Sequence, residues 1–341
     1  MGTEGEITTL GAFIKALEIG DPVGHLNLTL VPLRGDAAAR IEYVLAADAI
    51  RAGTLTVTEV SEAGSVPELA VTSTDDRMIL LLDGEELVGA KQNRILNTSI
   101  LLPPRAKTRI PVSCVEQGRW RHASQAFSPG NYSPSSLRAR KSHDVYRNLR
   151  AGDGPRSDQA AVWESVASNL QSAATESPTG SLHDAYERRQ ETLSGYVDAL
   201  PYPAGGHGVI VAIDGQFAAL DAFSRATTLE RIWGRLVTGY AMDALGREEG
   251  RKKTFTAKGA TAVFDHLAGI PCQPCPSVGI GEDWRFESDA LVGQALVAEG
   301  ECVHLCAFPA VSPGVAGERG LFIQPPSRRR SHRGRGDELV R

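Results

Sequence analysis

The amino-acid sequence predicts an α+β fold in which a β-rich, sandwich- or barrel-like N-terminal half packs with helices and terminal β-hairpins. Strand-like runs bounded by turn residues recur about every ten residues through the first third of the chain. Helical periodicity is confined to the middle, and alternating apolar runs return near the end. With 42% hydrophobic and 23% charged residues, the 341-residue chain has the composition of a globular protein with ample material for a core.

The N-terminal half is expected to be almost wholly β after a short helix, or strand–helix transition, over residues 7–17. Alternation over residues 25–33 predicts a half-buried strand, which Pro32 places toward a sheet edge. The Asp83-Gly84 pair is typical of a two-residue hairpin turn. Further strands are expected over residues 40–46, 54–60, 71–82, 99–102 and 108–115.

The segment 124–157 is expected to be an inserted loop and basic region. Residues 124–136 are rich in Ser and contain two Pro, which predicts a loop. Residues 137–150 hold five Arg or Lys, which we interpret as a solvated face. Five Arg in residues 327–335 have the same interpretation, and the chain is expected to be disordered from about residue 325.

Helices are expected to follow this segment. Apolar residues at four-residue spacing predict a helix over residues 158–172, and the capping pair Ser181 and Asp184 predicts another that runs to about residue 200. The strongest helical pattern covers residues 228–246. A shorter helix is expected over 258–267, a hairpin over 209–220, and strands over 284–287, 291–297 and 301–307.

Charge and composition exclude several classes of protein. The formal charge of −5 argues against broad nucleic-acid binding. No apolar stretch approaches the roughly 18 residues that span a bilayer, and the acidic start has no signal-peptide core, so we expect a cytoplasmic protein without membrane contact. The five cysteines, an odd number, are expected to be reduced thiols. The P-loop, G-x-S-x-G and H-E-x-x-H motifs of common enzyme classes do not occur.

A dense polar block lies between residues 85 and 97, and we regard it as the candidate site. Lys91 and Arg94 could grip an anionic group, while Gln92 and Asn93 could read a base or ribose. Glu85, Glu86 or Glu116 could act as general base if burial raised a pKa. The residues concerned are Glu85, Glu86, Lys91, Gln92, Asn93, Arg94 and Asn97 in the block and Glu116 after it. The same groups could instead form a self-satisfied salt-bridge network that braces the sheet, and spacing favours neither interpretation.

The cysteines offer a second candidate site. Cys272 and Cys275 have metal-knuckle spacing, and Cys302, His304 and Cys306 alternate along a predicted strand, so these last three would face the same side. Buried free cysteine is also common as a small apolar residue. We therefore expect no metal, and keep Cys272, Cys275, Cys302 and Cys306 as weak candidate ligands.

Residues 83–120, DGEELVGAKQNRILNTSILLPPRAKTRIPVSCVEQGRW, resemble the core of the ADP-ribosylglycohydrolase (ARG) and rhodanese/phosphatase-superfamily-associated protein domain family. The similarity continues to near Phe308 through SGYVDALPY, HGVIVAIDGQFAALDAF, TLERIWGRLVTGYAMDAL and VGIGEDWRFES. The resemblance implies a single domain over residues 1–324, with the insertion at about 124–157, and an Arg-rich tail over 325–341.

The family is named for neighbours that process ADP-ribose or phosphate esters, so the resemblance implies a part in an NAD-linked stress or defence pathway. It favours ligand contact at the matching positions Glu85, Glu86, Lys91, Gln92, Asn93, Arg94 and Glu116. Cys272 and Cys275 are not part of the recognised pattern.

We expect a domain that binds an ADP-ribose-like or other phosphate-bearing nucleotide ligand, with Glu86 or Glu116 as the catalytic base if it also processes that ligand. The alternative is a non-enzymatic protein-interaction module, in which the polar block is structural and residues 137–150 or the tail form the contact surface. The expected partners are a small nucleotide-like molecule or a protein, without a membrane or a specific nucleic acid. The sequence names no cofactor.

Overall fold

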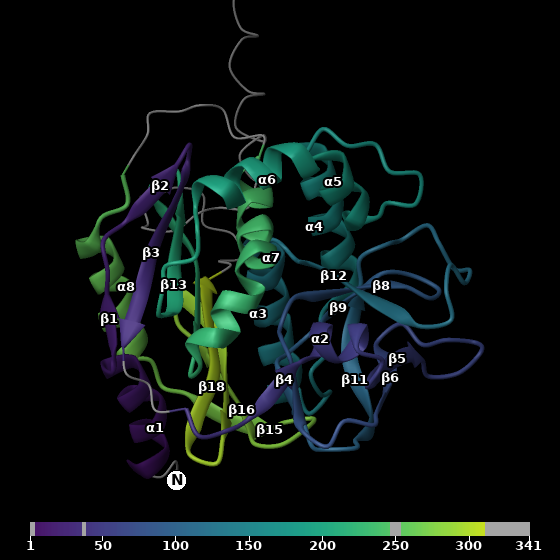
Figure 1. Cartoon of the computed structure of the whole chain (residues 1–341), viewed down its shortest axis with the longest axis horizontal. Helices are drawn as coiled ribbons and strands as arrows, with labels where there is room; N and C mark the ends of the chain where they lie inside the picture. The colour runs from purple at the N-terminus through teal and green to yellow at the C-terminus, as the bar shows by residue number, and fades with distance from the viewer. Residues whose placement is uncertain (1–3, 36–38, 246–253, 311–341) are drawn as a thin grey trace, which may run out of the picture.

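The computed structural model describes residues 4–35, 39–245 and 254–310, and these form eight helices and eighteen strands (Figure 1). The largest sheet has nine strands and is antiparallel throughout. Its order is β1 (Leu17–Ile19), β3 (Leu28–Gly35), β13 (Gly206–Ile213), β14 (Gln216–Phe223), β18 (Glu301–Pro309), β17 (Leu291–Ala298), β16 (Glu282–Glu287) and β15 (Gln273–Pro276), with β2 (Val23–His25) also paired to β3.

Two smaller sheets are built from the first 132 residues. The six-stranded sheet has the order β12 (Phe127–Tyr132), β8 (Glu85–Gly89), β9 (Arg94–Leu96), β11 (Lys107–Cys114), β6 (Glu68–Ser73) and β5 (Leu55–Glu59). Its two edge strands, β5 and β12, contact each other, so the sheet curls toward a barrel. The three-stranded sheet is β10 (Ile100–Leu102), β7 (Met78–Leu81) and β4 (Tyr43–Leu45).

The helices cover the sheets in separate layers. They are α1 (Glu4–Lys15), α2 (Ala46–Arg51), α3 (Ser135–Ala151), α4 (Gln159–Ser172), α5 (Leu182–Arg188), α6 (Gln190–Ala199), α7 (Ala226–Ala244) and α8 (Ala257–Ala268). In Figure 1, α1 and α8 lie on the outer side of the nine-stranded sheet, and α3 and α7 lie between that sheet and the six-stranded one. These layers enclose three apolar clusters: one under α1 and α8, one around α3 to α7, and one inside the curled sheet.

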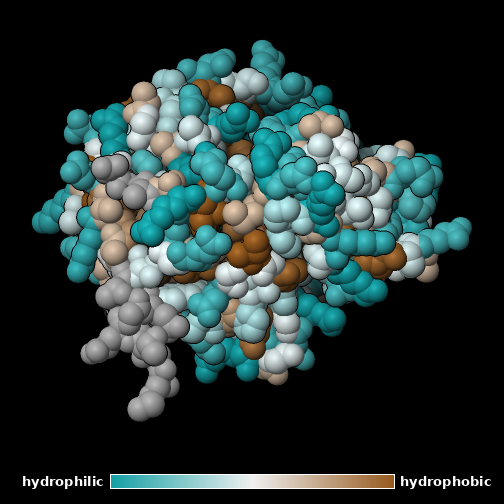
Figure 2. Space-filling view, turned by 60° about the horizontal axis from the view of Figure 1, so that its bottom comes forward, coloured by the Kyte–Doolittle hydropathy of each residue, from teal (hydrophilic) through white to brown (hydrophobic). Residues whose placement is uncertain are grey.

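The predicted α+β class is confirmed, and so are the strongest helical patterns. The stripe that predicted residues 228–246 is buried along α7, because its 3.6-residue period turns one face continuously toward the core. The helices predicted over 158–172 and 258–267 are α4 and α8. The hairpin predicted over 209–220 is β13 and β14, joined at Asp214-Gly215. The face of the molecule in Figure 2 is mainly hydrophilic around a central group of hydrophobic side chains.

Pro32 does not mark an edge strand, and that prediction is wrong. β3 pairs with β13 on one side and with β1 and β2 on the other. β2 pairs as far as Leu30 and β1 begins at Leu33, so Pro32 lies in the gap between them. Its missing N–H is tolerated there because no ladder hydrogen bond is needed from it.

Asp83-Gly84 forms a turn but not a hairpin. β7 before it pairs with β10 and β4, whereas β8 after it pairs with β9 and β12. The chain therefore passes from one sheet to another at this turn. Gly84, at φ +76°, is required because a Cβ there would lie 2.7 Å from Cδ of Arg138.

The segment 124–157 is structured, and residues 137–150 form a solvated face only in part. Residues 127–132 are β12, which pairs with β8, and residues 135–151 are α3. Arg138 and Lys141 on α3 are almost fully buried. Arg147 and Arg150 on the same helix are exposed, so the predicted contact surface of the interaction-module alternative lies partly inside the protein. The other predicted contact surface, the Arg-rich tail, lies outside the described residues.

Ser181 begins α5 as predicted, but its side chain makes no cap hydrogen bond and contacts Asn93 instead. The helix expected to reach residue 200 is divided at Arg189 into α5 and α6. Among the described residues, no helix is both long and apolar enough to cross a membrane.

Candidate functional site

The polar block forms the β8–β9 hairpin and the residues around it, and all eight predicted side chains are buried. They do not converge on one point. Glu86 pairs with Ile95 and Leu87 with Arg94 across the hairpin. Paired residues share a face of a sheet and successive residues alternate, so Glu86 and Arg94 point to opposite faces. The block divides into several groups with different partners.

Glu116 is the centre of the first group. Its carboxylate accepts hydrogen bonds from the Asn93 backbone N–H (3.0 Å), from Thr179 Oγ1 (2.9 Å) and from Arg119 Nε (2.8 Å) and Nη2 (2.6 Å). Burial alone would raise the pKa of Glu116, but the hydrogen bonds and the Arg119 charge outweigh burial and lower it. A saturated carboxylate with a lowered pKa is a weak proton acceptor.

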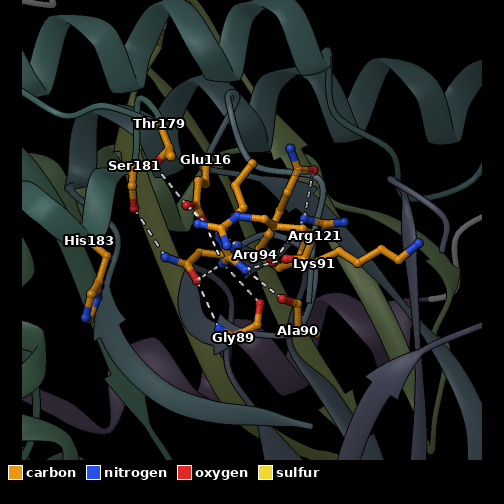
Figure 3. A network of polar contacts seen from close by, with 12 residues as sticks. Gly89, Ala90, Lys91, Arg94, Glu116, Arg121, Thr179, Ser181 and His183 are labelled. Atoms are coloured by element: carbon orange, nitrogen blue, oxygen red, sulfur yellow. Dashed lines mark hydrogen bonds and ion pairs between the residues drawn. The ribbon is translucent and has the colours of Figure 1, made fainter. Parts of the chain in front are cut away.

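Both the nitrogen and the oxygen of the Asn93 side-chain amide are hydrogen-bonded. Its Nδ2 donates to Ser181 Oγ (3.2 Å), and its Oδ1 accepts from the Gly89 N–H (3.0 Å) and from Arg119 Nη2 (3.2 Å). Figure 3 shows these contacts joining the β8–β9 loop to Thr179 and Ser181 ahead of α5. This group therefore braces segments that are far apart in the chain, as the structural interpretation predicts.

Glu85 and Asn97 also have structural partners. Glu85 Oε1 accepts from Arg235 Nη1 on α7 at 2.8 Å. Asn97 Oδ1 accepts from Ser113 Oγ at 2.6 Å, and its Nδ2 donates to the Pro155 carbonyl at 3.1 Å. Gln92 Oε1 accepts from Arg94 Nη1 at 3.2 Å, and lies 3.1 Å from the thiol sulfur of Cys114.

Lys91 and Arg94 form a different group with Trp120. We call this cluster of three packed side chains the cationic pocket. Lys91 Nζ lies 5.3 Å and Arg94 Cζ 5.8 Å from the centre of the Trp120 ring. Lys91 Nζ also donates to the Ala63 carbonyl at 2.9 Å. Trp120 is 47% exposed although both cations are buried. The indole therefore covers the two cations and presents its other surface to solvent.

Arg94 is incompletely paired. Nη1 donates to the carbonyl and side-chain oxygens of Gln92, but Nε and Nη2 are buried without a hydrogen-bond partner in the described part of the chain. The nearest carboxylate oxygen, Glu59 Oε1, is 3.9 Å from Nη2, and Glu59 Oε2 is also unpartnered. Burial lowers the pKa of Arg94, and Cys114 and Glu59 oppose that effect. Buried donors without acceptors are rare in folded proteins, so the two on this guanidinium call for an explanation.

Glu86, on the opposite face, pairs with His183 of α5 at 3.0 Å from Oε2 to Nδ1. His183 is only partly buried. This pair is separate from the cationic pocket.

A second buried cluster of charges, which sequence reasoning missed, joins α3 to the sheets. Arg138 donates to Asp83 and Asp221, and Lys141 donates to Asp83. His304 Nε2 lies 3.2 Å from Asp221 Oδ1, and Nδ1 lies 2.7 Å from Ser99 Oγ. The order Ser, His, Asp is that of a hydrolase triad, but Ser99, His304 and Asp221 are each at most 2% exposed, so no substrate reaches them.

The cysteines do not assemble into one metal centre. A register shift in β18 turns Cys302 to the apolar cluster under α1 and α8, whereas Cys306 faces the cluster around α3 to α7. The prediction that Cys302 faces the same side as His304 and Cys306 is therefore wrong. In the described ranges, the side chains of Asp221, His304 and Cys306 lie close enough together to hold a metal ion. The Asp221 carboxylate, however, already accepts two hydrogen bonds from Arg138. Cys272 packs against the cluster of Cys302.

One further cleft, of about 270 Å³, lies beside β3 and the segment after α6. Its walls are apolar, with Pro32, Tyr202 and Trp233 among them and Asp21 and Arg34 as charged members. None of the residues of the polar block lines it.

Several residues of the site were not predicted: Glu59, Arg119, Trp120, Thr179, Ser181, His183 and Arg235. Arg119 and Trp120 lie inside the segment that carries the family resemblance, so that segment was the available signal. The others come from β5, α5, α7 or the loop before α5. Nothing in their local sequence indicates that folding brings them to the polar block.

Comparison with known proteins gives one match. The family model of the ARG and Rhodanese-Phosphatase-superfamily-associated Protein domain matches residues 16–308. The match includes the polar block, the cationic pocket and the segment 124–157. No curated protein and no solved structure matches the chain significantly.

Proposed function

The chain belongs to the ARG and Rhodanese-Phosphatase-superfamily-associated Protein domain family, and we propose that it binds a phosphate-bearing nucleotide ligand at the cationic pocket. ADP-ribose represents the ligand class: an aromatic base joined to a diphosphate. The family name concerns associated proteins, so the link to NAD-dependent stress or defence pathways is part of this proposal.

The observation that carries the proposal is the state of Arg94. Its guanidinium is completely buried, yet Nε and Nη2 donate to no described acceptor, and Glu59 is 3.9 Å away. A buried charge without a close partner is unfavourable by several kcal/mol. Because Trp120 covers the buried guanidinium, the ligand would have to displace the indole to reach these nitrogens. A phosphate oxygen in contact with them would then form charge-assisted hydrogen bonds in a site of low dielectric constant, where such bonds are strongest.

Trp120 supports a nucleotide in preference to a free phosphate. Its ring lies over Lys91 and Arg94 and is half exposed, so a base can stack on the indole while the phosphates reach the cations. Stacking of a base on an aromatic side chain contributes about 1–3 kcal/mol. In Figure 3, Lys91 and Arg94 lie apart from His183, which is at the left of the view.

The predicted ligand residues have unequal support for this role. Lys91 and Arg94 keep the phosphate-binding role expected from the sequence. Asn93 and Glu116 are saturated by internal hydrogen bonds, which supports a bracing role for both. Gln92 binds Arg94 through Oε1, so we propose that it orients the guanidinium and does not read the base.

The test is a thermal-shift titration with ADP-ribose, NAD and pyrophosphate on the wild type and on Arg94→Met, which keeps the side-chain length and removes the charge. Arg109→Met is the matched control, because Arg109 lies on β11 and pairs at 3.1 Å with Glu68 at the surface. At a hundred times its Kd, a ligand stabilises the fold by about 2.7 kcal/mol, or several degrees in Tm.

The proposal predicts this shift in the wild type and in Arg109→Met and its loss in Arg94→Met. A larger shift with ADP-ribose than with pyrophosphate would support stacking on Trp120. Equal shifts in Arg94→Met and the wild type, or none with any of the three ligands, would contradict a site at Arg94.

A further inference from the structure

His183 contacts a buried carboxylate on the face of the β8–β9 hairpin opposite Arg94. It is the second residue of α5, and Nδ1 lies 3.0 Å from Glu86 Oε2. Glu86 is 1% exposed, whereas the side chain of His183 is 24% exposed. One side of the imidazole therefore faces a buried carboxylate, and the other side is accessible to solvent.

The Glu86 carboxylate is held rigidly for this contact. Oε2 also accepts the Asn131 backbone N–H at 3.1 Å, and Oε1 is buried without a partner among the described residues. A Cβ on Gly130 would lie 2.3 Å from Oε2. The absence of that Cβ, beside the register shift in β12, lets the backbone approach the carboxylate.

This geometry determines which nitrogen of the imidazole is free. An ionised carboxylate only accepts hydrogen bonds, so Nδ1 of His183 carries the hydrogen and Nε2 holds the lone pair. The nearest charged group to Nε2 is the exposed Glu187, at 3.8 Å. Nothing in the described part of the chain donates a hydrogen bond to Nε2.

We propose that His183 is the proton-transfer residue of a separate hydrolytic site, with Glu86 as its positioning residue. A buried carboxylate that fixes the tautomer of an accessible histidine and stabilises its protonated form is the arrangement that general acid–base catalysis needs. The hydrogen bond that His183 donates to Glu86 also raises the pKa of His183.

The charges around His183 disfavour an anionic substrate. Glu86, Glu187 and Asp184 are acidic neighbours, and Arg235, which faces Glu86 from α7, is already paired with Glu85. A phosphate would be repelled by this net negative charge, whereas an uncharged carboxylic ester would not. The site therefore differs in its ligand from the cationic pocket, and it does not rest on ligand binding there.

The proposed reaction is hydrolysis by water. Nε2 takes a proton from water as the water oxygen bonds to the ester carbonyl carbon. The bond from that carbon to the alkoxy oxygen then breaks, and the proton passes from Nε2 to the departing oxygen. One ester and one water give one carboxylic acid and one alcohol, without oxidation or reduction.

The experiment measures hydrolysis of p-nitrophenyl acetate by the full chain from pH 5 to 9, in the wild type, His183→Gln, Glu86→Gln and His122→Gln. His122 is the matched control, since it is exposed and lies 3.3 Å from a backbone carbonyl, without a carboxylate partner. We expect His183→Gln to lose the protein-dependent rate by about tenfold or more and His122→Gln to keep it.

The pH dependence of the rate in Glu86→Gln distinguishes a positioning role of Glu86 from a merely structural one. The rate rises with pH as His183 loses its proton, and removing the carboxylate should shift the midpoint of that rise to lower pH. If Glu86→Gln does not fold, Glu86→Asp replaces it, because the shorter side chain keeps the negative charge but moves it away from His183. A rate within twofold of wild type in folded His183→Gln, or an unmoved midpoint in the Glu86 variant, would overturn the proposal.

Discussion

Arg138 on α3 donates two hydrogen bonds to the carboxylate of Asp221 on β14, from Nη1 at 2.9 Å and from Nη2 at 2.7 Å, and both side chains are 1% exposed. Nε of the same guanidinium donates to Asp83 at 3.1 Å, in the turn that leads into the polar block. One buried arginine thus connects a helix, the nine-stranded sheet and the turn before β8. The position of the candidate site depends on this connection.

Replacing Arg138 by Met should destabilise the protein by roughly 3–5 kcal/mol, because Asp221 and Asp83 would remain buried without their guanidinium. Arg140→Met is the control on the same helix: Arg140 is partly exposed and lies 3.7 Å from Asp144, so its loss should change stability by less than about 1 kcal/mol. Urea unfolding followed by circular dichroism gives both values. Equal losses in the two variants would show that the buried contact has no special weight.

Stability should fall as the pH drops from about 4 to 2. Burial alone would raise the pKa of Asp221, but Arg138 and His304 outweigh it and lower the pKa to about 2. A carboxyl with a lowered folded-state pKa contributes stability above its unfolded pKa of about 3.9 and loses that contribution as it protonates in the fold, here on the order of 2 kcal/mol.

Urea unfolding at several values of pH measures this loss. The double variant Arg138→Met/Asp221→Asn, which removes both charges together, should lose about 2 kcal/mol less than the wild type over the same range. A wild type whose stability stays constant between pH 4 and 2 would be inconsistent with the charged pair.

Gly130→Ala should destabilise the protein by about 1–3 kcal/mol, because the added methyl would lie 2.3 Å from Glu86 Oε2 and 2.7 Å from Val88 Cγ2. The matched control is Gly195→Ala in the exposed interior of α6, where a Cβ meets nothing within 4 Å. Gly195→Ala should stabilise the protein by about 0.5–1 kcal/mol, since alanine is a better helix former than glycine. Thermal unfolding distinguishes the opposite signs, and a neutral Gly130→Ala would refute the close approach.

Local patterns were enough to predict the elements whose stability is local. The α7 stripe and the β13–β14 hairpin follow from a 3.6-residue period and an Asp-Gly turn, and neither needs a distant partner. The density of polar groups over residues 85–97 was also visible in the sequence, because so many polar groups rarely occur between two buried strands.

Other features could not be predicted because their cause is far away in the chain. A basic helix such as α3 is ordinarily solvated, and only the carboxylates of Asp83 and Asp221 make its burial possible. The Asp83-Gly84 turn has hairpin chemistry, but pairing of β7 with β10 and β4 removes its partner strand. Cys302 faces away from His304 because of a one-residue register shift that alternation cannot anticipate.

By itself, the sequence determined the α+β class, the principal helices, the polar block and the family resemblance, all of which depend on residue types and their spacing. Only the tertiary structure decided which polar groups satisfy one another. Within the described part of the chain, Glu116 and Asn93 are saturated by Arg119 and Ser181, Arg94 is left with unpaired donors, and Glu86 is turned to the opposite face toward His183. The physical reason is that burial and hydrogen bonding are long-range outcomes of folding, and the chemistry of a charged group depends on them as much as on its own identity.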